Sequence, residues 1–189
     1  PIIQSLGKRI EPEDSQDSSG IALRREIVDE MAVVLNSCER RNIILLGKAG
    51  TGKTTLLRQL ATRIEEGTAG KKLEGAVLVE LDISLMKSEG CIAGGIEKKI
   101  RHMWAEAENF GNVVFFMDEG HKTMSGGSDS IGNILKPLVT SGSVPVILAT
   151  TDDEYVSIER DAAMKRRFSP AHAPEPDRDS LLQILARKG

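Results

Sequence analysis

The chain has 189 residues, enough for one compact domain, and its 25 basic and 28 acidic side chains leave a formal net charge of −3. This balance gives no overall attraction to a phosphate backbone, and one Trp, one Tyr and four Phe offer few stacking surfaces, so the composition does not support nucleic-acid binding. No apolar run approaches the roughly 20 residues that cross a bilayer, and the first residues show no secretory signal. Two cysteines and three scattered histidines predict neither a disulfide framework nor a zinc site. We therefore expect a cytoplasmic protein.

Apolar strands alternate with amphipathic helices along most of the chain. The stretch 11–20 is acidic, Ser-rich and almost free of apolar side chains, and we expect residues 1–20 to form a flexible tail. The strands are predicted at 42–47, 75–84, 113–119 and 144–151. The helices are predicted at 21–37, 53–66, 96–107 and 130–140, with a last short one at 178–189. This alternation is typical of a parallel sheet that helices cover on both faces, so the predicted fold class is α/β.

A glycine-rich stretch joins the first predicted strand to the next helix. Gly47, Gly52, Lys53 and Thr54 match the pattern of two glycines separated by four residues and followed by Lys and Ser or Thr. In this pattern backbone N–H groups and a helix N-terminus surround a polyphosphate, so we expect Lys53 to reach the β- and γ-phosphates of ATP and Thr54 to ligate Mg²⁺. The expected nucleotide-binding residues are Gly47, Lys48, Ala49, Gly50, Thr51, Gly52, Lys53, Thr54 and Thr55. A turn that merely connects strand and helix is the alternative, which the complete match disfavours.

Two adjacent acids follow the third predicted strand. Asp118 and Glu119 come directly after four apolar residues and a methionine, at the strand end where open α/β sheets bind their ligands. We expect Asp118 to hold Mg²⁺ through water and Glu119 to orient and deprotonate an attacking water. Solvated turn residues are the alternative, which the preceding phosphate loop disfavours. One more strand lies between the loop strand and this one along the chain, an order expected of NTPases that use a glutamate base.

From about Leu23 onward the chain resembles the first ATPase domain of the Clp-type AAA+ unfoldases and disaggregases. The resemblance is closest over 149–168, ATTDDEYVSIERDAAMKRRF, which is similar to the family's block from a polar sensor residue to its arginine fingers. MDEGHKTM at 117–124 and GNILKPLVTSG at 132–142 are further matches. The resemblance implies a P-loop NTPase fold with a parallel five-stranded sheet, here over residues 21–174, and the start of a small helical subdomain at 175–189.

The resemblance also implies roles for individual residues. Thr151, with Thr150 as the less favoured choice, would be the sensor that hydrogen-bonds the attacking water or the γ-phosphate. Arg166 and Arg167 would act on the nucleotide of a neighbouring subunit in a ring, usually a hexamer, where a guanidinium stabilises transition-state charge. The alternative for these arginines is a solvated basic helix end, which the helix dipole favours.

Two stretches depart from the family pattern. In the stretch that corresponds to the family's pore loop, at 88–101, Gly94 and Glu97 match, but Ile92 stands at the aromatic position and Ala93 at the arginine. We therefore expect a weak or altered grip on a polypeptide substrate. The phosphate loop begins GKAG where relatives usually have GEPG, a change that removes no phosphate donor.

These features predict an ATP-hydrolysing domain that remodels a protein substrate or assembly. A nucleotide-switched binding module without threading activity is one alternative. A DNA-associated loader or transposition helper is another, disfavoured by the acidic charge balance.

Overall fold

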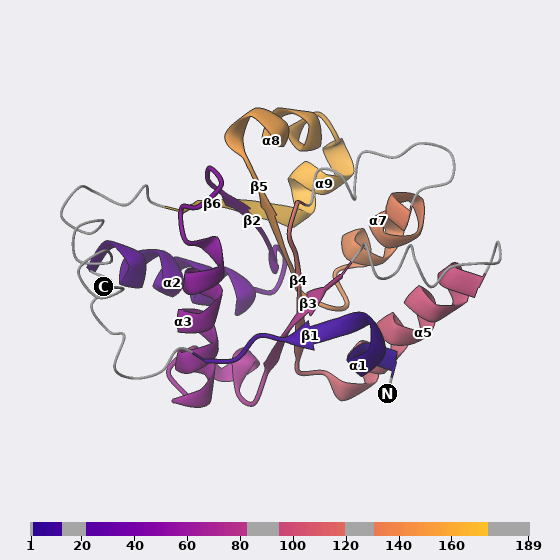
Figure 1. The fold of residues 1–189 in the computed structure, drawn as a ribbon, viewed down its shortest axis with the longest axis horizontal. Coiled ribbons are helices and arrows are strands. Elements are labelled where there is room, and N and C mark those ends of the chain that lie inside the picture. Colours follow the sequence, from indigo (N-terminus) through magenta and orange to yellow (C-terminus); the bar gives the residue numbers. More distant parts are fainter. Residues whose placement is uncertain (1, 13–21, 83–94, 120–130, 174–189) are drawn as a thin grey trace.

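The computed structural model describes residues 2–12, 22–82, 95–119 and 131–173 (Figure 1). Six strands form a single sheet in the order β1-β3-β4-β5-β2-β6. Their bounds are Gly7–Arg9 for β1, Asn42–Leu46 for β2, Val77–Leu81 for β3, Val113–Met117 for β4, Val146–Thr150 for β5 and Phe168–His172 for β6. The five strands from β2 to β6 run parallel, whereas β1 pairs with β3 in the antiparallel direction. The predicted α/β class and parallel five-stranded sheet are confirmed, with one antiparallel edge strand added.

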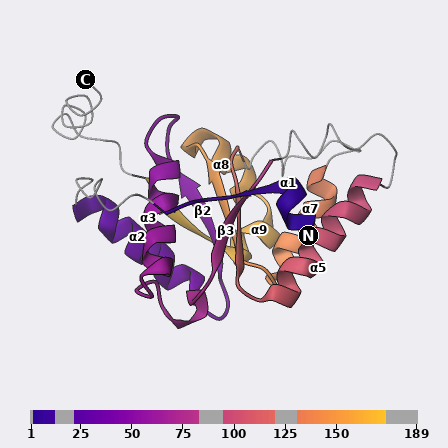
Figure 2. The same cartoon turned by 60° about the horizontal axis from the view of Figure 1, so that its bottom comes forward.

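Helices cover both faces of the sheet (Figure 2). Their bounds are Ile2–Leu6 for α1, Ala22–Leu35 for α2, Lys53–Glu65 for α3, Gly95–Phe110 for α5, Ile131–Ser141 for α7, Asp152–Glu159 for α8 and Ala162–Arg167 for α9, with a 3₁₀ turn, η2, at Lys71–Leu73. The helices α2 and α3 pack on one face, and α1, α5 and α7 pack on the other. Successive strand residues therefore enter opposite cores: Ile44 and Leu46 of β2 face α5 and α7, while Ile43 and Leu45 face α2 and α3.

The expectation that residues 1–20 form a flexible tail is wrong for residues 2–9. Residues 2–9 are not a tail, because they form α1 and β1, and Leu6 is only 1% exposed. The β1 strand lies close against its neighbour, since a β-carbon on Gly7 would lie 2.4 Å from a Val79 methyl carbon. The strand β6 is the fifth parallel strand of the predicted sheet, which the sequence analysis did not locate along the chain; it contains Pro170, and an edge strand tolerates a proline. Residues 13–20 and the predicted helix at 178–189 lie outside the described residues, and none of the described helices is long and apolar enough to cross a membrane.

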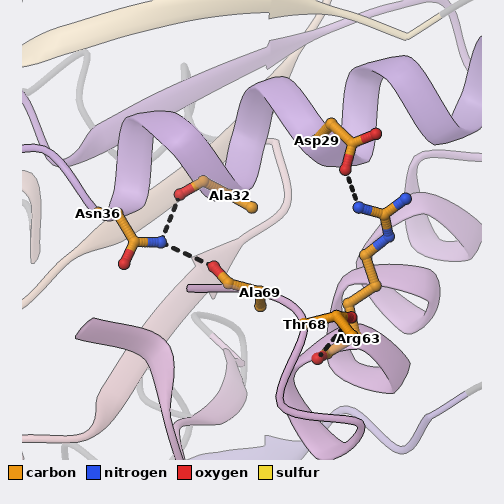
Figure 3. A network of polar contacts seen from close by, with 6 residues as sticks. All are labelled: Asp29, Ala32, Asn36, Arg63, Thr68 and Ala69. Atoms are coloured by element: carbon orange, nitrogen blue, oxygen red, sulfur yellow. Dashed lines mark hydrogen bonds and ion pairs between the residues drawn. The ribbon is translucent and has the colours of Figure 1, made fainter. Parts of the chain in front are cut away.

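Two polar networks fix the helices around β2 and α3. On one side of α3, Asp29 of α2 pairs with Arg63, and the Asn36 side-chain amide donates to the carbonyls of Ala32 and Ala69, each at 2.7 Å (Figure 3). On the other side, the Asn42 side chain, at the start of β2, donates to a carbonyl of α7 at 3.2 Å and accepts from the first N–H of β5 at 3.0 Å. These contacts hold the strand and helix that flank the glycine-rich loop.

The strand order determines where a ligand can bind. The strand β5 lies between β2 and β4 in the sheet, so the carboxyl ends of all three meet at one edge. The glycine-rich loop follows β2, the acidic pair follows β4, and the threonine pair lies at the end of β5. In open α/β sheets this edge is where ligands bind.

Candidate active site

The glycine-rich loop is fixed at its first residue by backbone hydrogen bonding and steric contact. The Gly47 N–H donates to the Thr150 carbonyl at 3.1 Å, which ties the loop to the end of β5. A β-carbon on Gly47 would lie 2.8 Å from the Thr51 hydroxyl oxygen and 3.0 Å from the Ala173 β-carbon, so a side chain there would force the loop to shift. Further along, Gly50 and Gly52 have φ values of 81° and 85°, in the left-handed region that glycine adopts without strain.

Lys53 begins α3 and folds its side chain back over the loop. Its ammonium donates to the carbonyls of Gly47 at 2.7 Å and Lys48 at 3.0 Å, and the Thr51 hydroxyl donates to the same Lys48 carbonyl at 3.0 Å. A fixed positive charge therefore lies beside the positive end of the α3 dipole. Both favour an anion at this point.

The acidic pair has an unusual backbone. Glu119 has a φ of 50°, and its N–H donates to the Asp118 carboxylate at 2.9 Å. The left-handed conformation costs a residue with a side chain about 1 kcal/mol or more, and such outliers occur often at functional sites. Both acids are exposed to solvent. A cation and a water molecule can therefore reach them from solvent.

A cavity of about 520 Å³ lies between the loop, the acidic pair and the end of β5. Its lining contains eight residues that the sequence assigned to the site: Ala49, Gly50, Gly52, Lys53, Thr54, Asp118, Glu119 and Thr151. Four others of the predicted loop residues lie outside this lining: Gly47, Lys48, Thr51 and Thr55. Phe116, Ala149, Thr150 and Glu154 also line the cavity, and of these the sequence analysis named only Thr150.

The two threonines at the end of β5 are held by one carboxylate. Thr150 is 3% exposed, and its hydroxyl donates to the Glu154 Oε2 at 3.0 Å. The same oxygen accepts the Thr151 N–H at 3.2 Å, at the N-terminus of α8. A Thr followed three residues later by Glu is a capping pattern, so the sequence contained a signal for Glu154.

The two arginines lie near the amino end of β2, whereas the cavity lies at the carboxyl ends of the strands. Arg166 and Arg167 are the last residues of α9 and are exposed. The next residue, Phe168, pairs with Asn42 at the start of β2, whereas the loop begins after the end of that strand. Arg167 also lies near the turn before β5, because a β-carbon on Gly142 would be 3.5 Å from its guanidinium. The arginines therefore do not reach the cavity of their own chain.

The base of the arginine helix is fixed by an aspartate. Asp161 caps α9 by accepting the backbone N–H groups of Ala163 at 3.0 Å and Met164 at 3.3 Å, and it pairs with Lys136 of α7. The hydrogen bond from Lys136, and then those backbone N–H groups, hold the pKa of the Asp161 carboxyl below its ordinary value, although partial burial opposes them.

The oxygen donors around the cavity fit a magnesium ion. Thr54 offers a hydroxyl and Asp118 a carboxylate, and Mg²⁺ usually takes one or two such protein ligands together with phosphate and water oxygens. Within the described residues no cluster of three or more Cys, His, Asp or Glu could hold a metal by itself. A cation at this site would therefore depend on the phosphates of its ligand.

Fold and cavity together define a phosphate-loop nucleotide-binding domain. The sequence model of the ATPase family associated with various cellular activities (AAA) matches residues 43–171, more than half of the chain, so the chain belongs to the AAA family. It is a Clp-type AAA+ domain, as the sequence predicted, and its relatives and structural neighbours support that class.

Similar proteins come from bacteria, plants and yeast. The ATP-binding subunit ClpE of Bacillus subtilis (strain 168) is 36% identical over 166 residues, 86% of this chain and 24% of that protein. The chloroplastic chaperone ClpC3 of Oryza sativa subsp. japonica is 34% identical over 167 residues, 86% of this chain and 18% of that protein. Structures of Hsp104 with ATPγS and FITC-casein, and of the S. cerevisiae Hsp104–ADP complex, give TM-scores of 0.84 and 0.80 at 30% and 29% identity. The matched region covers 99% of this chain and 34% of the Hsp104 chain in the first structure, and 97% and 26% in the second.

The chain thus spans about a quarter or less of the length of these Clp relatives. The relatives favour neither the binding module nor the DNA-associated loader. The pore-loop residues Ile92, Ala93 and Gly94 lie outside the described residues.

Proposed function

We propose that this domain binds ATP with Mg²⁺ in the cavity and hydrolyses it to remodel a protein substrate or assembly as part of a ring. The observation that carries the proposal is that Lys53 and the acids Asp118 and Glu119 line one cavity. Groups that could hold a polyphosphate therefore face groups that could hold a cation and a water molecule. Ring assembly and protein remodelling rest on kinship with the Clp relatives and with Hsp104, whose structures contain casein.

In this proposal the loop residues position the triphosphate. Backbone N–H groups of the loop and of the first turn of α3 bind phosphate oxygens, and Lys53 exchanges its loop carbonyls for the β- and γ-phosphates. Thr54 and Asp118 would hold the cation, and a cation bound there would supply positive charge next to the phosphate oxygens. No covalent step by the protein is required, so positioning and charge carry the rate.

Glu119 and Thr151 act on the attacking water. Glu119 accepts a proton from this water as the water oxygen bonds to the γ-phosphorus; the bond from that phosphorus to the bridging oxygen of the β-phosphate breaks, and ADP leaves. Thr151 hydrogen-bonds the water or the phosphate. Both residues line the same cavity, so one bound molecule can contact both. Arg166 and Arg167 stabilise the charge that develops on the phosphates bound to a neighbouring subunit. We also propose that the protein is cytoplasmic.

The test is to separate ATP binding from ATP hydrolysis. Glu119→Gln should bind ATP at least as tightly as the unaltered chain and lower turnover by about 100-fold or more, since general base catalysis contributes roughly 10²–10⁴-fold. Lys53→Ala should instead lose ATP binding. Calorimetry measures ATP binding, and phosphate release measures ATP hydrolysis. Normal ATP affinity in Lys53→Ala, or normal turnover in Glu119→Gln, would contradict the proposal.

A further inference from the structure

The side chain of Arg24 lies against the start of α3. Arg24 belongs to the first turn of α2 and is half-buried, whereas its neighbour Arg25 is exposed. A β-carbon on Gly52 would lie 3.4 Å from a terminal nitrogen of Arg24 and 3.8 Å from its central guanidinium carbon. The same β-carbon would lie 3.8 Å from the Thr55 hydroxyl oxygen. The guanidinium and the Thr55 hydroxyl therefore flank the same side of Gly52.

This position is electrostatically unfavourable without an anion. The N-terminus of a helix carries partial positive charge, and a cation there is repelled by it. Lys53 places a second positive charge in the same turn, and its ammonium is already bonded to loop carbonyls. No hydrogen bond or ion pair joins Arg24 to a carboxylate in the described part of the chain. An anion at the first turn of α3 would turn this repulsion into attraction.

The location relative to the cavity indicates which phosphates are concerned. The cavity that contains Glu119 and Thr151 is lined by Gly52, Lys53 and Thr54, but by neither Thr55 nor Arg24. The γ-phosphate must lie near Glu119 to be hydrolysed. Arg24 lies beside Gly52 but outside this lining, which favours a contact with the phosphates nearer the nucleoside over the γ-phosphate.

We propose that Arg24 is a nucleotide-binding residue that contacts the α- or β-phosphate of ADP and ATP. The inference rests on the proposed nucleotide site and adds a side chain from α2 to a loop otherwise built from one continuous stretch. A guanidinium suits this task because its planar fork donates two parallel hydrogen bonds to phosphate oxygens. The contact also ties α2 to the phosphate loop when a nucleotide is bound.

Equilibrium binding of ADP and ATP to Arg24→Ala, Arg24→Lys and Arg25→Ala tests the proposal. Arg24→Ala should weaken both nucleotides by a similar factor of about tenfold or more, as expected for one lost charged hydrogen bond. Arg24→Lys should lose less, because it keeps the charge, and Arg25→Ala should bind both nucleotides like the unaltered chain. In turnover measurements the loss should appear in KM for ATP much more than in kcat. Without nucleotide, thermal unfolding of Arg24→Ala should occur at the same or a higher temperature.

The outcomes separate this inference from the proposed function. If Lys53→Ala abolishes binding while Arg24→Ala binds ADP normally, the nucleotide site stands and the role of Arg24 is refuted. An Arg24→Ala variant that loses ATP but keeps ADP would place the residue at the γ-phosphate, which also contradicts the proposal. If Arg25→Ala lost as much nucleotide affinity as Arg24→Ala, the effect would come from the positive charge of this region and not from a specific contact by Arg24, which would contradict the proposal. If the unaltered chain binds neither nucleotide, both proposals fail.

Discussion

Replacement of Glu154 by alanine tests whether the carboxylate that caps α8 also positions the proposed sensor. Its Oε2 accepts the Thr150 hydroxyl at 3.0 Å and the Thr151 N–H at 3.2 Å. Loss of a helix cap costs about 0.5–2 kcal/mol and loss of one further hydrogen bond about 1 kcal/mol, so the free energy of unfolding should fall by about 2 kcal/mol. A domain of this size loses roughly 2–4 °C in Tm per kcal/mol, which gives a decrease of about 4–8 °C. The variant should therefore remain folded at moderate temperature.

The functional effect should exceed the structural one. Without Glu154, Thr151 is free to move from the cavity wall, and small displacements of a positioning group lower rates strongly, by up to about 100-fold. We expect kcat at saturating ATP to fall about tenfold or more, with little change in ATP affinity because the phosphate loop is untouched. Phosphate release and calorimetric titration, both well below the lowered Tm, measure these two quantities.

Two variants make the Glu154 result decisive. Asp153→Ala removes an exposed acid from the same helical turn and should change the free energy of unfolding by less than about 1 kcal/mol, with normal turnover. Glu154→Gln keeps an oxygen acceptor and should recover most of the activity lost in the alanine variant. If Glu154→Ala shows the expected loss of stability but full turnover, the carboxylate is only a helix cap and the reasoning about Thr151 is wrong.

Three further predictions concern packing and charge. Asn42→Leu should lower the free energy of unfolding by about 2–4 kcal/mol in denaturant titrations, because it leaves a strand N–H and a helix carbonyl buried without this partner. The control Asn112→Ala removes an exposed hydrogen bond and should lower the free energy of unfolding by less than about 1 kcal/mol. Gly47→Ala should weaken nucleotide binding, since its methyl group would lie 2.8 Å from the Thr51 hydroxyl oxygen and would force the loop to shift. Gly95→Ala, whose methyl group meets nothing within 4 Å, should bind normally, and normal binding by both variants would show that the loop adapts. Because the pKa of Asp161 is lowered on folding, its contribution to stability is complete above its unfolded value of 3.8 and is lost as the pH falls through the folded value. The unaltered chain should therefore have a higher free energy of unfolding than Asp161→Asn at pH 6, and this difference should become smaller below about pH 4. A difference in the free energy of unfolding that does not depend on pH would exclude the charge of Asp161 as its cause.

The phosphate loop could be predicted from the sequence because its structure depends on neighbouring residues. A buried strand, glycines at 50 and 52 with positive φ, and a helix starting at Lys53 all lie within one short stretch. The acidic pair was equally local, since it directly follows an apolar strand. Even the bond between Glu154 and Thr151 lies within one helical turn, and the capping pattern would have indicated it.

The sheet edges and Arg24 depend on contacts between residues far apart in the sequence. β6 is short and contains Pro170, and only its pairing with β2 shows that it is a strand. The short apolar segment around Leu6 looked like part of an acidic tail until it was placed against α5. Arg24 reaches Gly52 only because α2 packs beside α3, a geometry that spacing along the chain does not encode.

The position of the arginines requires that a site completed by them be shared between two copies of the chain. Arg167 precedes the residue that pairs with Asn42, and five residues of β2 separate that point from Gly47, about 16 Å at roughly 3.3 Å per residue. No movement of a single side chain closes that distance. A mixture of two variants tests the consequence: Glu119→Gln keeps its arginines but cannot hydrolyse ATP, and the double variant Arg166→Ala with Arg167→Ala keeps its cavity.

Each variant alone should be nearly inactive under conditions where the unaltered chain assembles and hydrolyses ATP. When the two are mixed, some intact cavities should lie next to intact arginines, and turnover should rise with protein concentration. In the matched controls, each variant is mixed separately with a chain that carries both defects. The added chain dilutes the intact groups of the variant and does not supply the group that the variant lacks. If the double arginine variant alone hydrolyses ATP at the full rate in assembled rings, the arginines have no role in catalysis. If the mixture of the two variants stays as inactive as its components although mixed rings form, the arginines do not act across a subunit boundary.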